Sequence, residues 1–514
     1  MKQVSWFSSY PLSELTRLDW ASVSYAGVVV FNEEWEILCM EQERGIDIPG
    51  GHSDNKESPL ETMRRETMEE VGIDIQEATI VAILQWSNEY RGIWNPKMVY
   101  FSAEWVDSKN AEEAFSKRAL THAHEASSIV FMKPQEFLKQ YAIQRKEPGH
   151  IVFIENMRIA IESAVEQYKK GVISIGLSAL GDHQVRWHLV PLNVDSRVRE
   201  ILVFDPLWEE SLTNLREKYA LSYEGIDRKI QWTVPDYKAL IDSDTSAVFI
   251  SSPDRFHIPQ MTEALNAGKH VFCEKPLVDT LGEVPKLVEN IISAREKWLI
   301  LSSCHPRRFD RPFTWLKKYL SEDAGIGKVL KMEFDFKYPA PEPGKEWLHA
   351  WLLADHFNHE IDLVNFYFGF SHFEAKKISD SQEEYGAQWK REDGIEFHFS
   401  GTRKKPRDWE YAENITIFGE NWSIRVDTET GEAVLTLNQE NPVILEKGLH
   451  TDYIWRFQKT TSNFIDAIVA GGRNYLTPMD LLINNLSGVV LTEQKTFSSR
   501  DYQEMMDLIS PSES

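Results

Sequence analysis

The stretch GHSDNKESPLETMRRETMEEVGI, residues 51–73, carries the most specific information in the chain. Ser58 followed by Pro59 predicts the N-cap and the first residue of a helix. One face of that helix carries three carboxylates at the spacing i, i+3, i+4: Glu66, Glu69 and Glu70. Because like charges on neighbouring turns repel each other, this face calls for a compensating cation.

A divalent cation would remove the repulsion, and carboxylate oxygens are hard ligands that suit Mg²⁺ or Mn²⁺. A diphosphate substrate would complete the coordination, and the metal would polarise phosphorus and activate a water molecule. Gly50 and Gly51 predict a tight turn that directs the Gly50 carbonyl at the same ions. The alternative interpretation is a solvated, glutamate-rich helix face, but the pattern fixes too many positions for that.

The same stretch matches the Nudix box, G-x5-E-x7-R-E-U-x-E-E-x-G-U, and residues 20–145 resemble Nudix hydrolases. The resemblance implies metal binding by Glu66, Glu69, Glu70 and Gly50, with Glu69 also counted as catalytic. It further implies that Arg65 orients the glutamates and that Glu57 supports the site from the preceding loop. We expect hydrolysis of a nucleoside diphosphate linked to another group, which the box does not specify.

Some members of this family recruit a further glutamate from a late loop as catalytic base or extra ligand. Glu125 is the candidate for that role, and an exposed loop acid is the alternative. The neighbouring His122 and His124 are interpreted as surface histidines rather than metal ligands.

A second pattern, GLSALG at residues 176–181, follows a predicted strand and is a G-x-G-x-x-G fingerprint with Ser178 in the central position. In such a fingerprint Gly176 makes the turn, the central residue lies against the pyrophosphate and Gly181 permits close helix packing. Ser178 adds bulk, but its hydroxyl can donate a hydrogen bond. Asp205 ends the next predicted strand, where an acid would bind the ribose hydroxyls of NAD; an ordinary turn aspartate is the alternative.

The segments SSPDRFH at 251–257 and AGKHVFCEKP at 267–276 resemble the Gfo/Idh/MocA family of oxidoreductases, a resemblance that covers about residues 171–500. In that family the Lys-Pro peptide bond is often cis, and the lysine reaches the substrate carbinol and the nicotinamide. Lys275 is therefore the expected catalytic lysine, and a surface lysine before a turn proline is the alternative. The resemblance also implies cofactor contacts from Ser252, Pro253, His257 and Glu274. Cys273 is interpreted as a buried strand residue rather than a nucleophile.

The segment DHFNHEID at 355–362 reproduces the D-x-x-x-H-x-x-D spacing of the same family. On a helix Asp355, His359 and Asp362 share one face, so an acid can orient the imidazole. We expect His359 to act as general base, with Asp355 as its catalytic partner, because the ordinary pKa of histidine suits proton transfer. His356 is the rival base.

The order of predicted elements favours an α/β and α+β multidomain chain. Strand-like runs around one charged helix predict a Nudix α/β/α sandwich at 1–150, and a connecting helix follows at 151–170. Alternating strands and helices predict a Rossmann doubly wound parallel sheet at 171–320. Strands predominate again in the C-terminal substrate and oligomerisation domain, 321–514, which predicts an α+β fold with an open, mainly antiparallel sheet.

Composition excludes several classes of protein. The three cysteines lie far apart, which argues against a disulfide scaffold or a cysteine-type zinc site. The net charge of −24 argues against a nucleic-acid partner. No apolar run is long enough for a membrane span, and the first residues lack an apolar signal core, so we expect a cytoplasmic protein.

We therefore expect a bifunctional enzyme that uses Mg²⁺ (or Mn²⁺) and NAD, with NADP as the alternative cofactor. The family's usual substrates are sugars, cyclitols and their derivatives, and its members commonly pair through the open sheet, so a homo-oligomer is expected. The main alternative is an oxidoreductase whose Nudix domain senses a nucleotide without hydrolysing it. A third hypothesis, a Rossmann binding module without catalysis, is supported by Ser178 alone.

Overall fold

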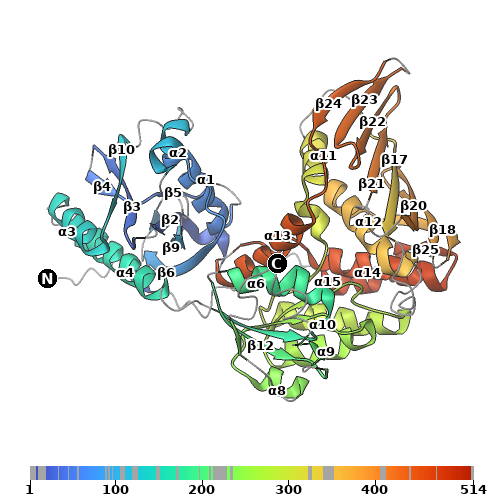
Figure 1. Ribbon diagram of the computed structural model, residues 1–514, viewed down its shortest axis with the longest axis horizontal. Helices are drawn as coiled ribbons and strands as arrows, with labels where there is room; N and C mark the ends of the chain where they lie inside the picture. The colour runs from blue at the N-terminus through green and yellow to red at the C-terminus, as the bar shows by residue number, and fades with distance from the viewer. Residues whose placement is uncertain are drawn as a thin grey trace.

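The computed structural model describes residues 7–9, 19–32, 34–43, 45–54, 57–86, 89–90, 93–94, 96–104, 110–118, 126–145, 151–168, 173–195, 197–207, 210–211, 213, 229–231, 236–321, 327–339, 352–381, 383–405, 412–438, 441–470 and 472–510. Within these ranges the chain forms an eight-stranded, a six-stranded and a nine-stranded sheet, and a two-stranded one. Figure 1 shows three lobes: the N-terminal one in blue, the parallel sheet with its helices in green, and the C-terminal sheet standing above it.

The N-terminal lobe is a mixed sheet between helices. Strand β2 (Val23–Phe31) pairs in parallel with β9 (Lys97–Glu104) at its centre. Val28 and Val30 pack in the cluster that includes helix α1 (Pro59–Val71), whereas Val29 and Phe31 pack in the cluster that includes α4 (Ile151–Tyr168). Since successive strand residues face opposite sides, this alternation confirms the predicted α/β/α sandwich.

The remaining elements of this lobe flank that centre. They are β1 (Phe7–Ser9), β3 (Ile37–Gln42), β4 (Gly45–Asp47), β5 (Gly50–His52), β6 (Ala78–Trp86), β10 (Ser128–Met132), α2 (Ala111–Lys117) and α3 (Pro134–Gln144). Helix α4, expected as a connecting helix, packs on the first sheet, because its buried face carries Met157, Ala160, Ile161 and Ala164.

The second sheet is parallel throughout, which confirms the predicted Rossmann sheet. Its order is β13-β12-β11-β14-β15-β16. The strands are β11 (Ile173–Ser178), β12 (Val198–Phe204), β13 (Ile230–Gln231), β14 (Ala247–Ile250), β15 (His270–Cys273) and β16 (Leu301–Ser303). In this doubly wound order, ligands bind at the carboxyl ends of the strands near β11 and β14. Helices α9 (His257–Asn266) and α10 (Val284–Glu296) supply crossovers.

The third sheet is antiparallel except for the pair β17 and β20, as predicted for an open, mainly antiparallel sheet. Its order is β24-β23-β22-β21-β17-β20-β19-β18-β25. The strands are β17 (Lys331–Pro339), β18 (Phe373–Asp380), β19 (Glu384–Arg391), β20 (Glu396–Lys405), β21 (Ala412–Phe418), β22 (Trp422–Asp427), β23 (Glu432–Leu437), β24 (Val443–Lys447) and β25 (Thr496–Ser498). Helices α12 (Leu352–Phe368) and α14 (Pro478–Glu493) contribute to its core.

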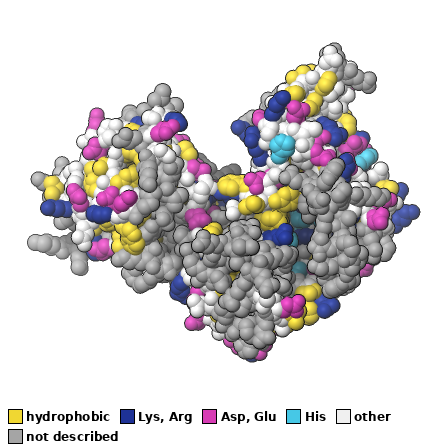
Figure 2. Space-filling model, in the orientation of Figure 1, with side chains coloured by type: hydrophobic (Ala, Val, Ile, Leu, Met, Phe, Trp, Pro, Cys, Tyr) yellow, Lys and Arg dark blue, Asp and Glu magenta, His cyan; other side chains and the backbone are white. Residues whose placement is uncertain are grey.

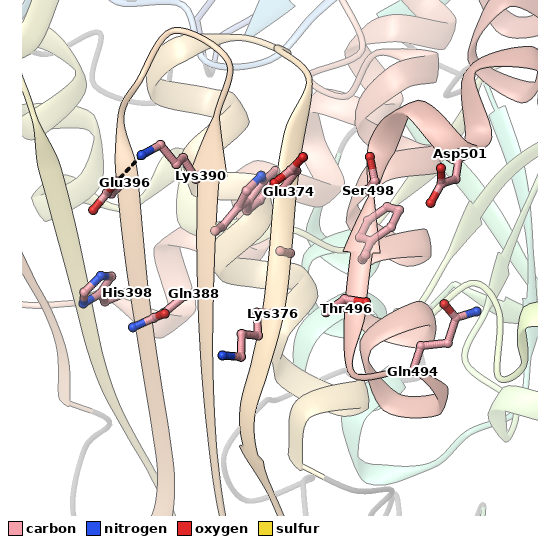
Figure 3. A pocket seen from close by; sticks show the side chains of 13 residues that line it. Glu374, Lys376, Gln388, Lys390, Glu396, His398, Gln494, Thr496, Ser498 and Asp501 are labelled. Carbon is pink, nitrogen blue, oxygen red and sulfur yellow. Dashed lines mark hydrogen bonds and ion pairs between the residues drawn. The ribbon is translucent and has the colours of Figure 1, made fainter.

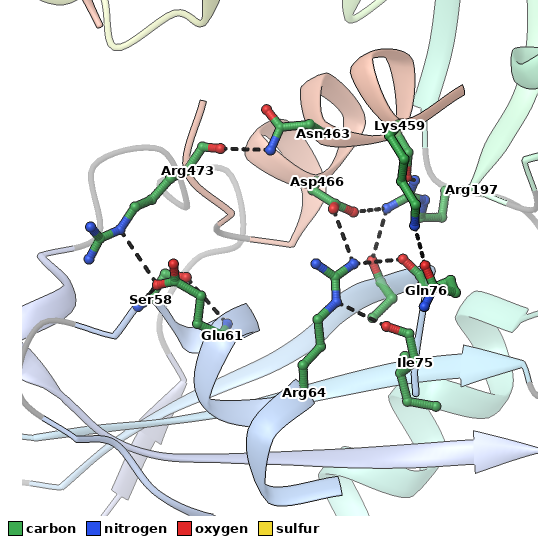
Figure 4. Close-up of polar contacts among 12 residues, drawn as sticks. Ser58, Glu61, Arg64, Ile75, Gln76, Arg197, Lys459, Asn463, Asp466 and Arg473 are labelled. Atoms are coloured by element: carbon green, nitrogen blue, oxygen red, sulfur yellow. Dashed lines mark hydrogen bonds and ion pairs between the residues drawn. The ribbon is translucent and has the colours of Figure 1, made fainter. Parts of the chain in front are cut away.

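Helix α13 (Tyr453–Val469) joins the lobes through a buried ion group. Asp466 accepts from the Arg64 guanidinium of α1 at 3.2 Å and also pairs with Arg197. Arg197 is almost fully buried and donates to Asp195 at 2.6 and 2.9 Å. Figure 4 shows the contacts of Arg64 and Arg197 with Asp466 of α13, and Figure 2 shows a hollow between the lobes with hydrophobic side chains at its base.

Asp466→Ala is expected to lower the free energy of unfolding by about 3 kcal/mol, because it leaves a buried arginine short of one partner. Urea unfolding of the full chain measures this. The control is Arg473→Ala, which removes a half-exposed pair with Glu61 at 3.5 Å and should cost about 0.2–1 kcal/mol. Equal losses in both variants would show that burial does not set the strength of this junction.

None of the helices in the described ranges combines the length and the apolar character that a bilayer span requires.

Candidate functional sites

Arg65 lies at the centre of the carboxylate cluster on α1. Its Nε and Nη2 donate to the two Glu57 oxygens at 2.8 and 3.0 Å. Its Nη1 donates to Glu66 at 2.9 Å and to Glu69 at 3.2 Å. Hydrogen bonds from Arg65 lower the pKa of Glu57, and the same contact raises the pKa of Arg65. The structure thus places Arg65 among the glutamates, where the resemblance expects it.

Local capping fixes the start of α1 and therefore the direction of its carboxylates. The Ser58 hydroxyl accepts from the Glu61 amide at 3.3 Å, and the Glu61 carboxylate accepts from the Ser58 amide at 2.6 Å. Gly72 ends the helix in the left-handed conformation at φ 76°. These are the capping box and the glycine C-cap that short-range sequence signals predict.

The glycine turn before α1, residues Gly50 and Gly51, lies against the carboxylates of the helix. The Gly50 amide donates to Glu70 at 2.8 Å, so the contact seen here uses the amide of Gly50, whereas its carbonyl was expected to face the ions. A Cβ on Gly51 would lie 2.2 Å from the Glu66 carboxyl carbon. The backbone at Gly51 therefore leaves room for the Glu66 carboxylate. Within the described residues the three carboxylates do not meet as closely as ligands of one ion, because Glu66 and Glu69 pair with Arg65 and Glu70 accepts from the Gly50 amide.

Gly51→Ala is expected to reduce Mg²⁺ affinity about tenfold or more, because the new methyl group displaces Glu66 and loss of ligand support typically costs 10–100-fold. Isothermal titration with Mg²⁺ measures this. Gly181→Ala is the control, since a Cβ there meets no atom within 4 Å. Unchanged Mg²⁺ binding in Gly51→Ala would remove Glu66 from the ligand set.

The late-loop candidates cannot be placed. Glu125, His122 and His124 lie outside the described residues, so the predicted role of Glu125 stays a prediction.

In the second lobe, the turn after β11 differs from the expected fingerprint. Gly176 lies inside β11, paired with Leu202 and Val248, so it does not make the turn as predicted. The positive φ of 76° belongs to Ala179. The reason is that β11 continues through Ser178, which shifts the turn toward the C-terminus.

Ser178 and Asp205 both contact protein groups in this structure. The buried Ser178 hydroxyl donates to Gln260 at 3.0 Å. Asp205 follows β12, as predicted, and its carboxylate accepts from the amides of Leu180 and Leu207, both at 2.7 Å. Asp205 therefore holds the loop after β11, and ribose hydroxyls would have to replace or share these contacts.

The loop after β14 is held by a network that the sequence did not predict. The Ser252 hydroxyl also donates to Gln260, at 2.7 Å. His257 was expected to contact the cofactor, but its two ring nitrogens lie 2.8 Å from the Ser252 carbonyl and 2.7 Å from the Pro276 carbonyl. It is buried and connects two loops, so its role here is positional. Pro253 precedes the short helical turn Asp254–Phe256 in the same loop.

The segment after β15 has the backbone expected from the resemblance. The Lys275-Pro276 peptide bond is cis. Glu274, expected to contact the cofactor, is buried and lies 2.6 Å from His188 Nε2 and 3.0 Å from His183 Nε2. Cys273 is buried in β15, and burial raises the pKa of its thiol, which fits a strand residue rather than a nucleophile.

Two buried histidines lie near Lys275, whose charge acts on both rings. The rings of His305 and His359 are 5.4 Å apart, edge to face. Burial lowers the pKa of His305 to about 3, and the positive charges of Arg308 and Lys275 contribute to this shift. Burial also lowers the pKa of His359 well below its ordinary value, with smaller contributions from the charges of Arg307 and Lys275. Both imidazoles are therefore neutral at pH 7, and each is a weaker base than the ordinary histidine that the sequence analysis assumed.

Three ring nitrogens of His305 and His359 are buried without a hydrogen-bond partner among the described residues. They are both ring nitrogens of His305 and Nδ1 of His359. Because buried polar groups are normally satisfied, such atoms mark a place for water or ligand hydroxyls. His305 was missed by the sequence analysis. Its position just after β16, at the carboxyl edge of a parallel sheet, is the signal that could have found it.

The structure describes the side chain of only one of the two acids of the α12 motif. Asp355 belongs to α12, but its side chain lies outside the described set, so its pairing with His359 stays a prediction. Asp362 accepts from Arg308 Nε at 2.9 and 3.0 Å and from Asn484 at 2.8 Å, which makes it an anchor for Arg308. The rival base His356 stacks on Tyr338 at 3.9 Å.

Glu360, next to His359, provides a test of buried charge. It accepts from Tyr338 at 2.8 Å and from Tyr385, and burial raises its pKa to about 7. A raised folded pKa adds stability below the unfolded pKa of 4.5 and loses it as the pH rises through about 7. Glu360→Gln should therefore gain about 3 kcal/mol relative to wild type between pH 5 and 8.5. A pH-independent difference in urea unfolding would contradict this.

Comparisons with known proteins assign two parts of the chain to domain families. Residues 22–156 match the NUDIX domain model, and residues 205–301 match the model of the oxidoreductase family with an NAD-binding Rossmann fold. The chain thus combines a carboxylate-bearing α/β/α domain with a dinucleotide-binding oxidoreductase domain. By family, it carries a NUDIX domain followed by a Gfo/Idh/MocA Rossmann domain.

Curated relatives match the oxidoreductase part. An uncharacterised oxidoreductase of Schizosaccharomyces pombe is 30% identical over 186 residues, 34% of this chain and 47% of that protein. Myo-inositol 2-dehydrogenase of Thermotoga maritima is 28% identical over 163 residues, 31% of this chain and 45% of the enzyme. The chain spans less than half the length of these relatives.

Among solved structures, the apo scyllo-inositol dehydrogenase of Lactobacillus casei aligns with a TM-score of 0.50 at 19% identity. The alignment covers 64% of this chain and 99% of that one, and it shows the fold alone.

Proposed function

We propose that the chain is a bifunctional enzyme. Its NUDIX domain hydrolyses a nucleoside diphosphate-linked compound with Mg²⁺, and its second half transfers a hydride between NAD(P) and a sugar, cyclitol or sugar derivative. The observation that carries the oxidoreductase part is the meeting of Lys275, His305 and His359 at the carboxyl edge of the parallel sheet. The inositol dehydrogenases among the relatives support a polyol as substrate.

In the proposed oxidation, a dinucleotide bound at the carboxyl edge of the parallel sheet would supply the acceptor for the hydride of the carbinol carbon. The Lys275 ammonium stabilises negative charge on the carbinol oxygen, and neutral His359 takes the hydroxyl proton. The unpartnered nitrogens of His305 would meet a neighbouring substrate hydroxyl. Arg308, held by Asp362 and Asp480, keeps the nearby His305 deprotonated through its charge.

In the NUDIX domain, Glu66, Glu69 and Glu70 would hold the metal, which polarises phosphorus and activates water when bound. Arg65 fixes two of these carboxylates from one guanidinium, so they are preorganised before substrate arrives. The Gly50 amide fixes the third.

The experiment that tests both activities begins with ligands retained by the purified full chain, identified by mass spectrometry. Their chemical classes then set two panels: nucleoside diphosphate derivatives for Mg²⁺-dependent phosphate release, and polyols or sugars for absorbance at the NADH band. If no member of either panel reacts, with ligands bound in neither domain, the proposal fails.

A second candidate function for the NUDIX domain is nucleotide sensing, and one chain of contacts favours it. Arg64 of α1 pairs with Asp466 of α13, and Thr461 of α13 lies 3.2 Å from His188, which contacts Glu274 beside Lys275. A bound nucleotide that shifts α1 could thereby change the dehydrogenase site. If so, nucleotide should alter dehydrogenase kcat/KM in wild type and in Glu69→Gln, but not in Asp466→Asn.

We also propose that the chain acts in the cytoplasm as a homo-oligomer. The outer face of the third sheet carries a groove of about 480 Å³ lined by β18, β19, β20 and β25, with Glu374, Lys376, Gln388 and His398 along it (Figure 3). Sedimentation velocity on the full chain tests the oligomeric state, and a monomer at all concentrations would contradict it.

A further inference from the structure

Three metal-binding side chains from distant parts of the sequence meet at the end of β15. The Nε2 atoms of His183 and His188 lie 3.0 and 2.6 Å from the same Glu274 oxygen, Oε1. All three donor atoms lie within 4.8 Å of one another. Neighbouring ligands on one ion with bonds of about 2.0–2.2 Å are separated by about 3.0–3.5 Å. The contact of His183 has this spacing, whereas the shorter contact of His188 would have to lengthen by a few tenths of an ångström to admit an ion.

The backbone that presents the histidines is unusual. Residues Val185–Leu189 form a π-helical turn between α5 (Asp182–Gln184) and α6 (Val190–Val194). In a regular α-helix, residues five apart point in different directions, whereas the wider π turn brings His183 and His188 onto one side. Such turns are rare and occur frequently at functional sites.

The surroundings of His188 resemble the second shell of a metal ligand. Its Nδ1 lies 3.2 Å from the Thr461 hydroxyl of α13, which fixes the ring with Nε2 toward Glu274. Metal-binding histidines normally make such a contact with the second nitrogen. The rings of Phe249 and Phe272 enclose His188 at 5.5 and 5.1 Å, so the buried side of the cluster is apolar.

The charge states of these groups also suit a cation. Burial lowers the pKa of His188, so its imidazole is neutral, the form that binds metals. Burial raises the pKa of Glu274, but His183 and His188 outweigh it and hold that pKa well below its usual range. The His183 side chain is 47% exposed, which leaves an open side for exchange of ions and water.

We propose that His183, His188 and Glu274 bind a divalent transition-metal ion such as Zn²⁺ or Co²⁺. Two imidazoles and one carboxylate select such ions over Mg²⁺. The carboxylates of the NUDIX domain offer only oxygen ligands, which suit Mg²⁺. Glu274 also accepts from the Lys275 amide at 3.3 Å, so the ion would fix the backbone that carries Lys275. Metal binding at this cluster can be tested without either proposed activity.

The test uses the full chain without an affinity tag, stripped with EDTA and held in excess Mg²⁺ to occupy the NUDIX carboxylates. Equilibrium dialysis against Zn²⁺ and the visible absorption of Co²⁺ report binding. We expect one Zn²⁺ per chain, and at least a tenfold loss of affinity in His183→Ala. Thr461→Val should weaken binding about 10–100-fold through the second shell. His398→Ala, a partly exposed histidine of β20, is the matched control and should bind like wild type.

Because His183 is half exposed, its replacement should leave the fold intact, which circular dichroism and the urea midpoint check. Absence of Zn²⁺ binding in excess Mg²⁺ would overturn the proposal. Binding that His183→Ala and Thr461→Val leave unchanged would also overturn it, since the cluster would then be a proton-sharing network alone.

Discussion

Lys275→Ala is expected to lower kcat/KM for polyol oxidation by about 10²–10⁴-fold while leaving dinucleotide affinity within a few-fold. Lys275 follows β15 and acts by its charge on two buried groups, lowering the pKa of both His305 and His359. Its removal takes away the positive charge that stabilises the carbinol oxygen as hydride leaves. It also raises the pKa of His359, which makes this imidazole a stronger base and offsets part of the loss.

Initial rates at the NADH band, with the panel substrate that reacts best, give kcat/KM, and quenching of protein fluorescence by NAD(P)H gives the cofactor affinity. Lys286→Ala is the matched control, because this lysine is half exposed on α10 and pairs with Glu289 at 2.6 Å. A loss confined to cofactor affinity would contradict the assignment of Lys275 to chemistry. Equal activity in the two variants would remove it from the site.

The elements with local signals could be predicted well from the sequence. The start of α1 was expected at Ser58 and Pro59, and the structure places its capping box there. Such caps depend on residues within one helical turn, so no distant contact is needed to establish them. The parallel order of the second sheet followed in the same way from alternating strands and helices.

Features that depend on long-range contacts could not be predicted. His305 is a site residue because the chain after β16 lies beside α12, so that its ring contacts the ring of His359 from the other domain. The side-chain oxygen of Gln260 accepts hydrogen bonds from the hydroxyls of Ser178 and Ser252, although neither sequence motif predicts this contact. The shift of the turn from Gly176 to Ala179 depends on the length of β11, which strand pairing with β12 and β14 decides.

The α13 helix explains why the two domains fold as neighbours rather than as separate modules. It contributes Asp466 to the pair with Arg64 of the NUDIX helix and Thr461 to the contact with His188. Apolar residues of both domains, including Leu60, Ile173 and Phe464, belong to one continuous buried cluster. Packed side chains therefore connect the NUDIX site to the dehydrogenase site.

Glu69→Gln is expected to reduce Mg²⁺-dependent phosphate release by about 10²–10³-fold, because metal stabilisation of the transition state is worth several kcal/mol and each 1.36 kcal/mol is a factor of ten. Glu69 is part of the glutamate face that Arg65 organises, with 3.2 Å between Nη1 and the carboxylate. Glutamine keeps the size and the hydrogen bond but loses the charge. Since the change also relieves repulsion among neighbouring carboxylates, the thermal midpoint of the apo protein should stay the same or rise.

That combination separates loss of chemistry from loss of fold. In wild type Mg²⁺ should raise the thermal midpoint, because a ligand that binds the native state stabilises it, and in Glu69→Gln this increase should shrink. Glu113→Gln, an exposed acid of α2 that pairs with Lys117, is the matched control and should keep both activity and the Mg²⁺ effect. Full hydrolysis by Glu69→Gln would show that phosphate release does not depend on the charge of Glu69. Loss of hydrolysis with the Mg²⁺ effect intact would instead assign Glu69 as the catalytic base. The metal ligands would then be Glu66 and Glu70, on the same face of the helix.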